Sequence, residues 1–288
     1  MEITIIILTV RYTQQHQKNN LKNSLTSGGV VYSTNYELRG SRGMKKLGVI
    51  GGLGPLATSR LYELIIKMTD VTRDQDHMEI LIHSKPSIPD RTDYILGRSK
   101  ENPLNMMSEV GENLVLAGAD YLAIPCITGH YFYENLSKRI HVPIIHMIKE
   151  TVNHCKRLGV SCAGIMATKG TIFSKLFQLE FQHEGIKTVV PSEIMQDYVT
   201  SLIYQNIKVN IPPDMDKFTA VEKELRENGA EIIILGCTEL SLIKRDYLIG
   251  PGYLDVLEVL AMQSILLCEA NLKDEYRAFI DTQPIILR

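Results

Sequence analysis

The chain contains one unit twice, and this internal repeat constrains the fold more than any other feature of the sequence. Gly118-Ala119-Asp120 lies eight residues before Cys126, counted from the glycine, and Gly229-Ala230-Glu231 lies eight residues before Cys237. An apolar run separates the acid from the cysteine in both copies. A repeated unit of this kind predicts that the chain folds into two similar halves.

Two further landmarks occur in the same order in each copy. Upstream, Gly48-Val49-Ile50-Gly51-Gly52 and Gly164-Ile165-Met166-Ala167-Thr168 begin 78 and 73 residues before the two cysteines. Downstream, Pro143-Ile144-Ile145-His146 and Gly252-Tyr253-Leu254-Asp255 end 20 and 18 residues after them. We therefore expect two α/β halves related by a pseudo-twofold axis. Open α/β sheets bind ligands at the carboxyl ends of their strands, so the active-site cleft is expected between the halves.

Short apolar runs alternate with segments of helical period from Met44 onward. Apolar residues at spacings of three and four predict helices over 61–68 and 104–116, and Gly118 follows the second where a helix would end. The runs that predict strands are Leu47 to Ile50, Ile80 to Ile82, Tyr121 to Ile124, Val142 to Ile145, Ala163 to Met166, Thr188 to Val190 and Ile232 to Leu235. This alternation predicts an α/β protein with mainly parallel sheets.

The first 43 residues differ from the rest. An apolar run from Ile3 to Val10 is followed by a polar stretch, and Met44-Lys45-Lys46 resembles a natural start. We expect residues 1–43 to be an extension outside the catalytic fold. We expect a first domain from residues 44–148 and 258–288 and a second from residues 149–257.

Composition excludes several classes of protein. Thirty-three acidic and 31 basic side chains give a net charge of −2, which is not the basic footprint that a nucleic-acid partner requires. The run from Ile3 to Val10 has eight residues, short of the roughly 20 that span a bilayer, and no cationic stretch precedes it. These observations favour a cytoplasmic protein without a membrane partner. Five cysteines without a CxxC pair argue against a disulfide framework.

The repeated cysteines are candidates for chemistry. Cys126-Ile127-Thr128 and Cys237-Thr238 each follow a buried-type strand, so the two sulfurs should face each other across the cleft. Two thiols on opposite faces of one carbon suit a two-base proton transfer, in which one removes a proton and the other supplies one. A free thiol with a pKa of about 8.5 must be ionised by its surroundings to act as the base. Cys155, Cys162 and Cys268 occupy no repeated position and are expected to pack in the core.

Several motifs resemble those of the aspartate/glutamate racemase family, whose members racemise amino acids without pyridoxal phosphate. The resemblance covers the chain from Met44 onward. The motifs are Gly51-Gly52-Leu53-Gly54-Pro55-Leu56-Ala57-Thr58, Pro89-Asp90-Arg91-Thr92, Pro125-Cys126-Ile127-Thr128-Gly129-His130, Ala167-Thr168-Lys169-Gly170-Thr171 and Leu235-Gly236-Cys237-Thr238-Glu239.

The resemblance implies a role for each matching residue. Cys126 and Cys237 would be the acid/base pair, and Arg91 with Lys208 would hold the side-chain carboxylate of the substrate. The remaining substrate-binding residues would be Ile127, Thr128, Gly129, Thr238 and Thr168. The family resemblance also implies an acidic amino acid as substrate, no cofactor and a homodimer. Eight histidines without HxH or HExxH spacing give no reason to expect a metal.

One position departs from the family pattern. After the first cysteine the family has Asn-Thr-Ala-His, whereas this chain has Ile127-Thr128-Gly129-His130. Isoleucine cannot make the side-chain hydrogen bond of asparagine, although its backbone N–H remains. Loss of such a partner costs about 1–3 kcal/mol, enough to reduce activity or change the substrate.

Other functions remain open at this point. Gly52-Leu53-Gly54-Pro55-Leu56-Ala57 fits the G-x-G-x-x-A pattern of dinucleotide-binding proteins, but the next strand is followed by His83-Ser84-Lys85, with no ribose-binding acid. The alternatives that stay are a related racemase or isomerase acting on a hydantoin or on maleate, and an amino-acid-binding protein that has lost turnover through Ile127.

Overall fold

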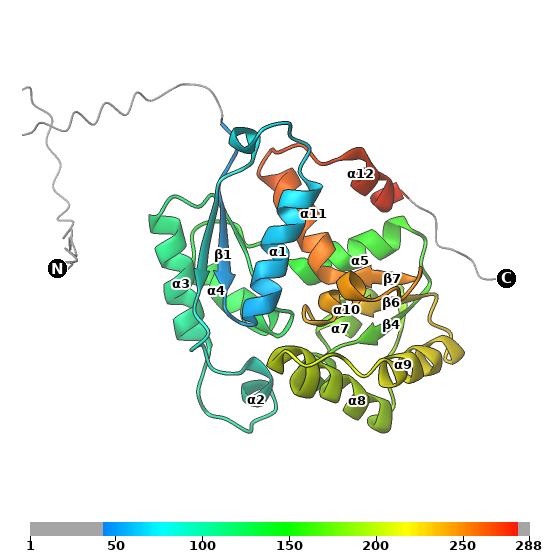
Figure 1. Ribbon diagram of the computed structural model, residues 1–288. Coiled ribbons are helices and arrows are strands. Elements are labelled where there is room, and N and C mark those ends of the chain that lie inside the picture. Colours follow the sequence, from blue (N-terminus) through cyan, green and yellow to red (C-terminus); the bar gives the residue numbers. More distant parts are fainter. Residues whose placement is uncertain (1–42, 282–288) are drawn as a thin grey trace, which may run out of the picture. The chain divides into compact units, whose positions relative to one another are not determined.

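The computed structural model describes residues 43–281, which form two parallel β-sheets flanked by helices (Figure 1). The first sheet has the strand order β2-β1-β3 and the second has the order β5-β4-β6-β7. The strands are β1 Leu47–Gly51, β2 Ile80–Ser84, β3 Tyr121–Ala123, β4 Cys162–Met166, β5 Lys187–Val189, β6 Ile232–Leu235 and β7 Tyr253–Asp255. Every strand pair is parallel. The predicted α/β class with two similar halves is confirmed. The expected extension lies outside the described residues, except for Gly43.

Helices connect the strands and cover both sheets (Figure 1). In the first half they are α1 Pro55–Met68, α2 Arg91–Ile95, α3 Leu104–Leu116, α4 Tyr133–Arg139 and α5 Met147–Arg157, with short 3₁₀ turns at Asp74–Asp76 and Thr128–Phe132. After β4 the helices are α6 Lys169–Phe173, α7 Leu176–His183, α8 Glu193–Thr200, α9 Met215–Glu227, α10 Leu240–Asp246, α11 Val256–Leu267 and α12 Asp274–Asp281. A π-helical turn at Ser201–Asn206 and a 3₁₀ turn at Ile207–Val209 follow α8.

The two sheets correspond strand by strand. β1 lies between β2 and β3 as β4 lies between β5 and β6. β7 pairs with β6, and its counterpart in the first half is a single parallel bridge between Leu122 and Ile144. The strand predicted over 142–145 is therefore wrong in extent. Pro143 has no N–H to donate to a ladder, and Met147 already begins α5, so pairing is limited to the two hydrogen bonds that Leu122 makes.

The repeated Gly-Ala-acid motif ends a helix and aligns the next strand. Gly118 and Gly229 have φ values of +96° and +95°, and the alanine N–H after each bonds back to the helix, as in a Schellman motif. The acid then accepts a backbone N–H just before the central strand: Asp120 from Lys46 at 2.7 Å and Glu231 from Ser161 at 2.9 Å. The motif thus fixes the register of the strand that leads to each cysteine.

Residues at equivalent positions of the two repeats also cap a helix, α5 in the first copy and α11 in the second. The His146 imidazole accepts the Lys149 N–H at the start of α5, and the Asp255 carboxylate accepts the Leu257 N–H at the start of α11. These are the last residues of the downstream landmark in the two copies. Each side chain satisfies a backbone donor that the helix leaves free.

The main hydrophobic core joins the two halves. Buried residues of β1, α1, α5, β4 and α11 belong to one cluster, and separate clusters lie on the outer side of each sheet. Figure 1 shows α1 and α11 running side by side between the sheets. The halves are therefore held together by shared apolar packing. The domain boundaries expected at residues 148 and 257 stay a prediction.

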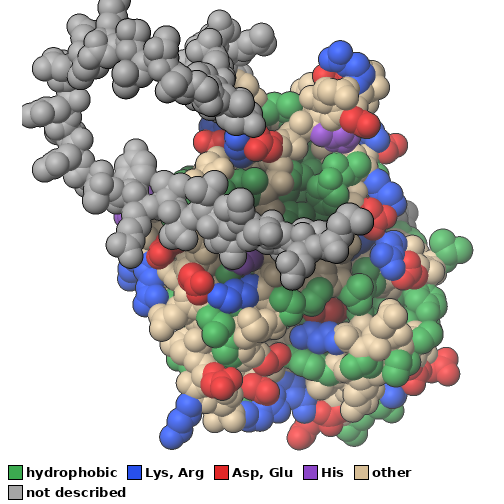
Figure 2. All heavy atoms as spheres, turned by 60° about the vertical axis from the view of Figure 1, so that its left-hand side comes forward, with side chains coloured by type: hydrophobic (Ala, Val, Ile, Leu, Met, Phe, Trp, Pro, Cys, Tyr) green, Lys and Arg blue, Asp and Glu red, His purple; other side chains and the backbone are tan. Residues whose placement is uncertain are grey.

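The surface of the described residues carries charges of both signs. On the face shown in Figure 2, basic and acidic side chains are interspersed. Within residues 43–281, no helix combines the length and apolarity needed to cross a membrane. In the same part of the chain, no three or more His, Cys, Asp or Glu side chains are grouped to hold a metal ion.

Gly52→Ala is expected to destabilise the fold more than a glycine substitution of matched backbone conformation. Gly52 has φ +86°, and a Cβ there would lie 2.5 Å from the backbone nitrogen of Lys85. Gly118 has φ +96° with nothing within 4 Å of the added Cβ, so Gly118→Ala carries the backbone strain alone. That strain is worth about 1–2 kcal/mol. Gly52→Ala adds a steric clash to this strain, so its free energy of unfolding in urea should be about 1–3 kcal/mol lower than that of Gly118→Ala, as for an overpacked core. Equal losses would contradict the contact.

Candidate active site

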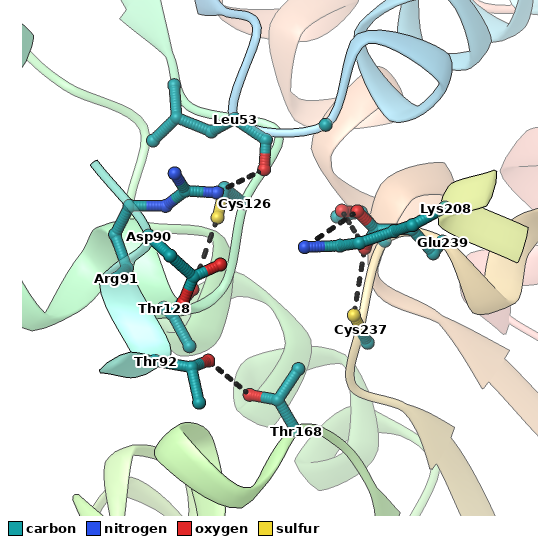
Figure 3. A network of polar contacts seen from close by, with 12 residues as sticks. Leu53, Asp90, Arg91, Thr92, Cys126, Thr128, Thr168, Lys208, Cys237 and Glu239 are labelled. Atoms are coloured by element: carbon teal, nitrogen blue, oxygen red, sulfur yellow. Dashed lines mark hydrogen bonds and ion pairs between the residues drawn. The ribbon is translucent and has the colours of Figure 1, made fainter. Parts of the chain in front are cut away.

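A narrow cavity between the carboxyl ends of the two sheets contains both repeated cysteines. Cys126 follows β3 and Cys237 follows β6, and Figure 3 shows them on opposite sides of the space between the halves. The cavity has an empty volume of about 280 Å³. Its lining residues are Leu53, Asp90, Arg91, Cys126, Ile127, Thr128, Thr168, Thr171, Tyr204, Lys208, Gly236, Cys237, Thr238 and Glu239.

The structure brings the expected site residues together, with one exception. Gly129 is buried behind the wall, where an added Cβ would lie 2.9 Å from Ile124, and its N–H bonds the Cys126 carbonyl at 3.1 Å. That N–H is therefore engaged within the protein. Ile127 does line the cavity, but its side chain is 3% exposed and also belongs to the main core.

On the first wall, hydrogen bonds fix the loop that carries Cys126. The Cys126 Sγ lies 3.3 Å from the Thr128 hydroxyl. His130 is buried behind them: its Nδ1 is 3.0 Å from the Cys126 carbonyl, and its Nε2 accepts the Met147 N–H at 3.2 Å. This pattern assigns the ring proton to Nδ1, and burial lowers the pKa of His130. His130 is a neutral link between the cysteine loop and α5.

On the second wall, Cys237 lies against a carboxylate. The Cys237 Sγ donates a hydrogen bond to Glu239 Oε2 at 2.9 Å. Burial, and next the negative charge of Glu239, raise the pKa of the Cys237 thiol well above its ordinary value. The Thr238 hydroxyl lies 3.1 Å from the Pro125 carbonyl and donates to it, which ties the two cysteine loops together across the cavity.

Arg91 is held by backbone carbonyls. Its Nη1 donates to Ile88 and Pro89 at 3.2 and 2.9 Å, and its Nη2 donates to Leu53 at 2.6 Å. Arg91 is the first residue of α2, and the Asp90 carboxylate caps that helix by accepting the Asp93 N–H. These bonds occupy three of the five guanidinium N–H groups. The Nε group is buried and has no hydrogen-bond partner among the described residues.

Lys208 reaches the cavity from the 3₁₀ turn that follows the π-helical turn. Its Nζ lies 3.8 Å from Glu239 Oε1 and 4.4 Å from the centre of the Tyr204 ring. Burial is the largest single influence and opposes its charge, but electrostatic interactions with Glu239 first, and then with Tyr204 and the two repeated cysteines, together raise the pKa of Lys208. Burial also raises the pKa of Tyr204 to about 12, so its hydroxyl is neutral. The cavity therefore holds two cations, Arg91 and Lys208.

Helices α2 and α6, one from each side of the cavity, are in contact with each other. The Thr92 and Thr168 hydroxyls lie 3.5 Å apart across the halves (Figure 3). Thr168 also caps α6 by accepting the Thr171 N–H at 3.2 Å. Gly170 allows the close approach, because a Cβ there would lie 3.0 Å from the Thr92 Cα.

Sequence reasoning missed some of the lining residues. Glu239 stands two residues after Cys237, so its position in the repeat was a signal for it. Tyr204 stands four residues before Lys208, a spacing that puts both on one helical face. Leu53 and Asp90 stand in motifs shared with the racemase family, but no role was assigned to them. Leu53, Asp90, Arg91, Lys208 and Glu239 also line a second cavity of about 740 Å³, so the two cavities are adjacent.

Known proteins resemble this chain in sequence and in fold. The Asp/Glu/hydantoin racemase family model matches residues 50–262. The chain is 27% identical over 204 residues to a broad-specificity amino-acid racemase, RacX, of Bacillus subtilis (strain 168), covering 68% of this chain and 86% of the relative.

Solved structures with the same fold include two kinds of racemase. Picrophilus torridus aspartate racemase is 29% identical with a TM-score of 0.73, covering 82% of this chain and 99% of that chain. A glutamate racemase from Francisella tularensis, solved with D-glutamate, is 17% identical with a TM-score of 0.55, covering 78% of this chain and 81% of that chain, and shares the fold. On the family match over most of its length, the chain belongs to the Asp/Glu/hydantoin racemase family.

Proposed function

We propose that this protein racemises an acidic amino acid, aspartate or glutamate, by proton transfer at Cα between Cys126 and Cys237 without a cofactor. The observation that carries the proposal is the pair of cysteines at equivalent strand ends on opposite walls of one cavity. Two bases on opposite faces of a carbon invert it, because the face that loses the proton differs from the face that gains one.

The cations of the cavity support an acidic substrate. The buried Nε–H of Arg91, which has no hydrogen-bond partner among the described residues, is left for a carboxylate. A planar guanidinium favours such a pairing, and Lys208 adds a second positive charge. A hydantoin carries no distal carboxylate for these groups, which favours the amino acid over the hydantoin alternative.

The threonines suit the polar end of the substrate. Because the Thr238 hydroxyl proton is directed to Pro125, its oxygen is left to accept a hydrogen bond, as a substrate ammonium would supply. The Thr128 hydroxyl lies beside the Cys126 sulfur and donates to it when the sulfur is ionised. The carbanion formed at Cα would be stabilised by donors fixed in a buried cavity, where their interactions are strong.

The expected result in D₂O is exchange of the α-proton for deuterium together with inversion. The native protein is incubated with each enantiomer of aspartate and glutamate, and exchange is followed by proton NMR while inversion is followed by chiral chromatography. Alanine, lysine and serine belong in the panel, because the similar Bacillus protein has broad specificity.

The matched control is the Cys126→Ala/Cys237→Ala double variant, which should exchange none of them. Absence of exchange by the native protein with every amino acid tested would contradict the racemase proposal and favour a binding protein. Inversion by the double variant would contradict the roles of the cysteines.

A further inference from the structure

We propose that Glu239 holds the proton on Cys237 in the unliganded protein, so that Cys237 begins the reaction as the acid and Cys126 as the base. Glu239 is a positioning residue here, since it acts through the sulfur that it touches. The inference rests on the two-cysteine reaction proposed above. It assigns different starting roles to two cysteines that the repeat makes equivalent.

The hydrogen bond at Cys237 has a fixed direction. Glu239 Oε2 lies 2.9 Å from the sulfur, and an ionised carboxylate can only accept, so the proton belongs to the thiol. Glu239 is 3% exposed and Cys237 is 6% exposed. Ionising this thiol would put two negative charges in contact with little water to screen them, which is unfavourable.

Cys126 has a hydroxyl and a cation beside its sulfur, where Cys237 has a carboxylate. Its sulfur lies 3.3 Å from the Thr128 hydroxyl, which can donate to a thiolate. The guanidinium of Arg91 acts on the same sulfur electrostatically. Figure 3 shows Arg91 beside Cys126 on one wall and Glu239 beside Cys237 on the other. A cation and a donor stabilise the ionised form of a cysteine, whereas a carboxylate stabilises the protonated form.

Other charged groups around the cavity do not remove this difference. Lys208 favours ionisation of Cys237, but its Nζ is paired with Glu239 Oε1 at 3.8 Å. The remaining titratable groups of the lining are Asp90, Arg91, Tyr204 and Cys126. Gly54 gives Glu239 its room, because a Cβ there would lie 2.5 Å from Oε1.

The difference has a consequence for the substrate. In the first half-reaction Cys126 takes the α-proton, breaking the Cα–H bond and forming S–H. Cys237 then gives its own proton to the opposite face of Cα and becomes the thiolate. The unliganded protein is therefore prepared for the enantiomer that presents its α-proton to Cys126.

The test is a pH titration of Cys237 without substrate. In a Cys126→Ala background, thiolate ultraviolet absorbance is followed with pH for the parent and for Glu239→Gln, and the same titration of Cys126→Ala/Cys237→Ala is subtracted to remove the signal of the other three cysteines and the tyrosines. Removing the carboxylate removes the charge that favours the neutral thiol, so the midpoint should fall by about one pH unit or more, equivalent to roughly tenfold more thiolate below the midpoint. Glu239→Asp, which restores a carboxylate, should return the midpoint toward the parent value.

Glu109→Gln is the matched control, because Glu109 is an exposed carboxylate paired with Lys85. It should leave the midpoint unchanged. An unchanged or higher midpoint in Glu239→Gln would overturn the proposal. If that variant does not fold by circular dichroism, iodoacetamide labelling of the native chain at neutral pH, located by peptide mass spectrometry, should modify Cys126 before Cys237; the reverse order would overturn it. Neither measurement needs turnover, so a failed racemase assay is a separate result.

Discussion

Cys126→Ala and Cys237→Ala should each lower the racemisation rate by about 10²–10⁴-fold, the usual contribution of a general acid or base. Each variant keeps one sulfur, on one face of the substrate. Cys237→Ala should therefore still exchange the α-proton of one enantiomer with solvent deuterium, and Cys126→Ala that of the other, more slowly because Glu239 favours the protonated form of Cys237. The measurement is racemisation by chiral chromatography beside deuterium exchange by NMR.

Cys162→Ala is the matched control for these substitutions. Cys162 begins β4, is partly exposed and lies outside the cavity lining, so its loss removes a thiol without touching the site. Its activity should equal that of the native protein. Native racemisation rates in both Cys126→Ala and Cys237→Ala would contradict the two-base reaction.

Arg91→Ala should lower kcat/KM for aspartate by roughly a hundredfold or more, because losing one partner of a buried charge pair costs about 2–5 kcal/mol. The loss for alanine, which has no distal carboxylate, should be much smaller. The ratio of the two losses separates substrate binding from structural damage. The damage itself comes from leaving the Leu53, Ile88 and Pro89 carbonyls without their donor.

Arg98→Ala is the comparison for Arg91. Arg98 lies just after α2, is 56% exposed and pairs with Asp93 at 3.0 Å, so removing it changes the charge near this helix without entering the cavity. Native kinetics are expected. Equal losses for aspartate and alanine in Arg91→Ala would mean that Arg91 acts on its loop or on Cys126 and does not bind the distal carboxylate.

Local patterns predicted much of the fold. β1, β4 and β6 are apolar runs buried in the sheets, and period and length alone predicted them. The positions of Cys126 and Cys237 followed from their strands, because parallel strands bring their carboxyl ends to one edge. The strand predicted over 142–145 is only a single bridge, because the prediction counted apolar residues and Pro143 has no N–H for the ladder.

The contacts inside the site could not be predicted in the same way. Arg91 meets the Leu53 carbonyl, 38 residues away, and Lys208 meets Glu239 through a π-helical turn that breaks the helical period. These contacts depend on how loops from separate strands pack. Lys208 was predicted only from the family resemblance. The role of Glu239 follows only from the structure, which places its carboxylate 2.9 Å from the Cys237 sulfur.

The two helix starts at His146 and Asp255 show how a duplicated unit can diverge. An imidazole in one copy and a carboxylate in the other both accept a backbone N–H at the start of a helix, and Asp255 also accepts a hydrogen bond from the Ser241 hydroxyl. The cysteine position kept the same residue in both copies, although their neighbours, Thr128 and Glu239, came to differ. Within a single chain, comparing one half with the other separates what the scaffold tolerates from what the chemistry demands.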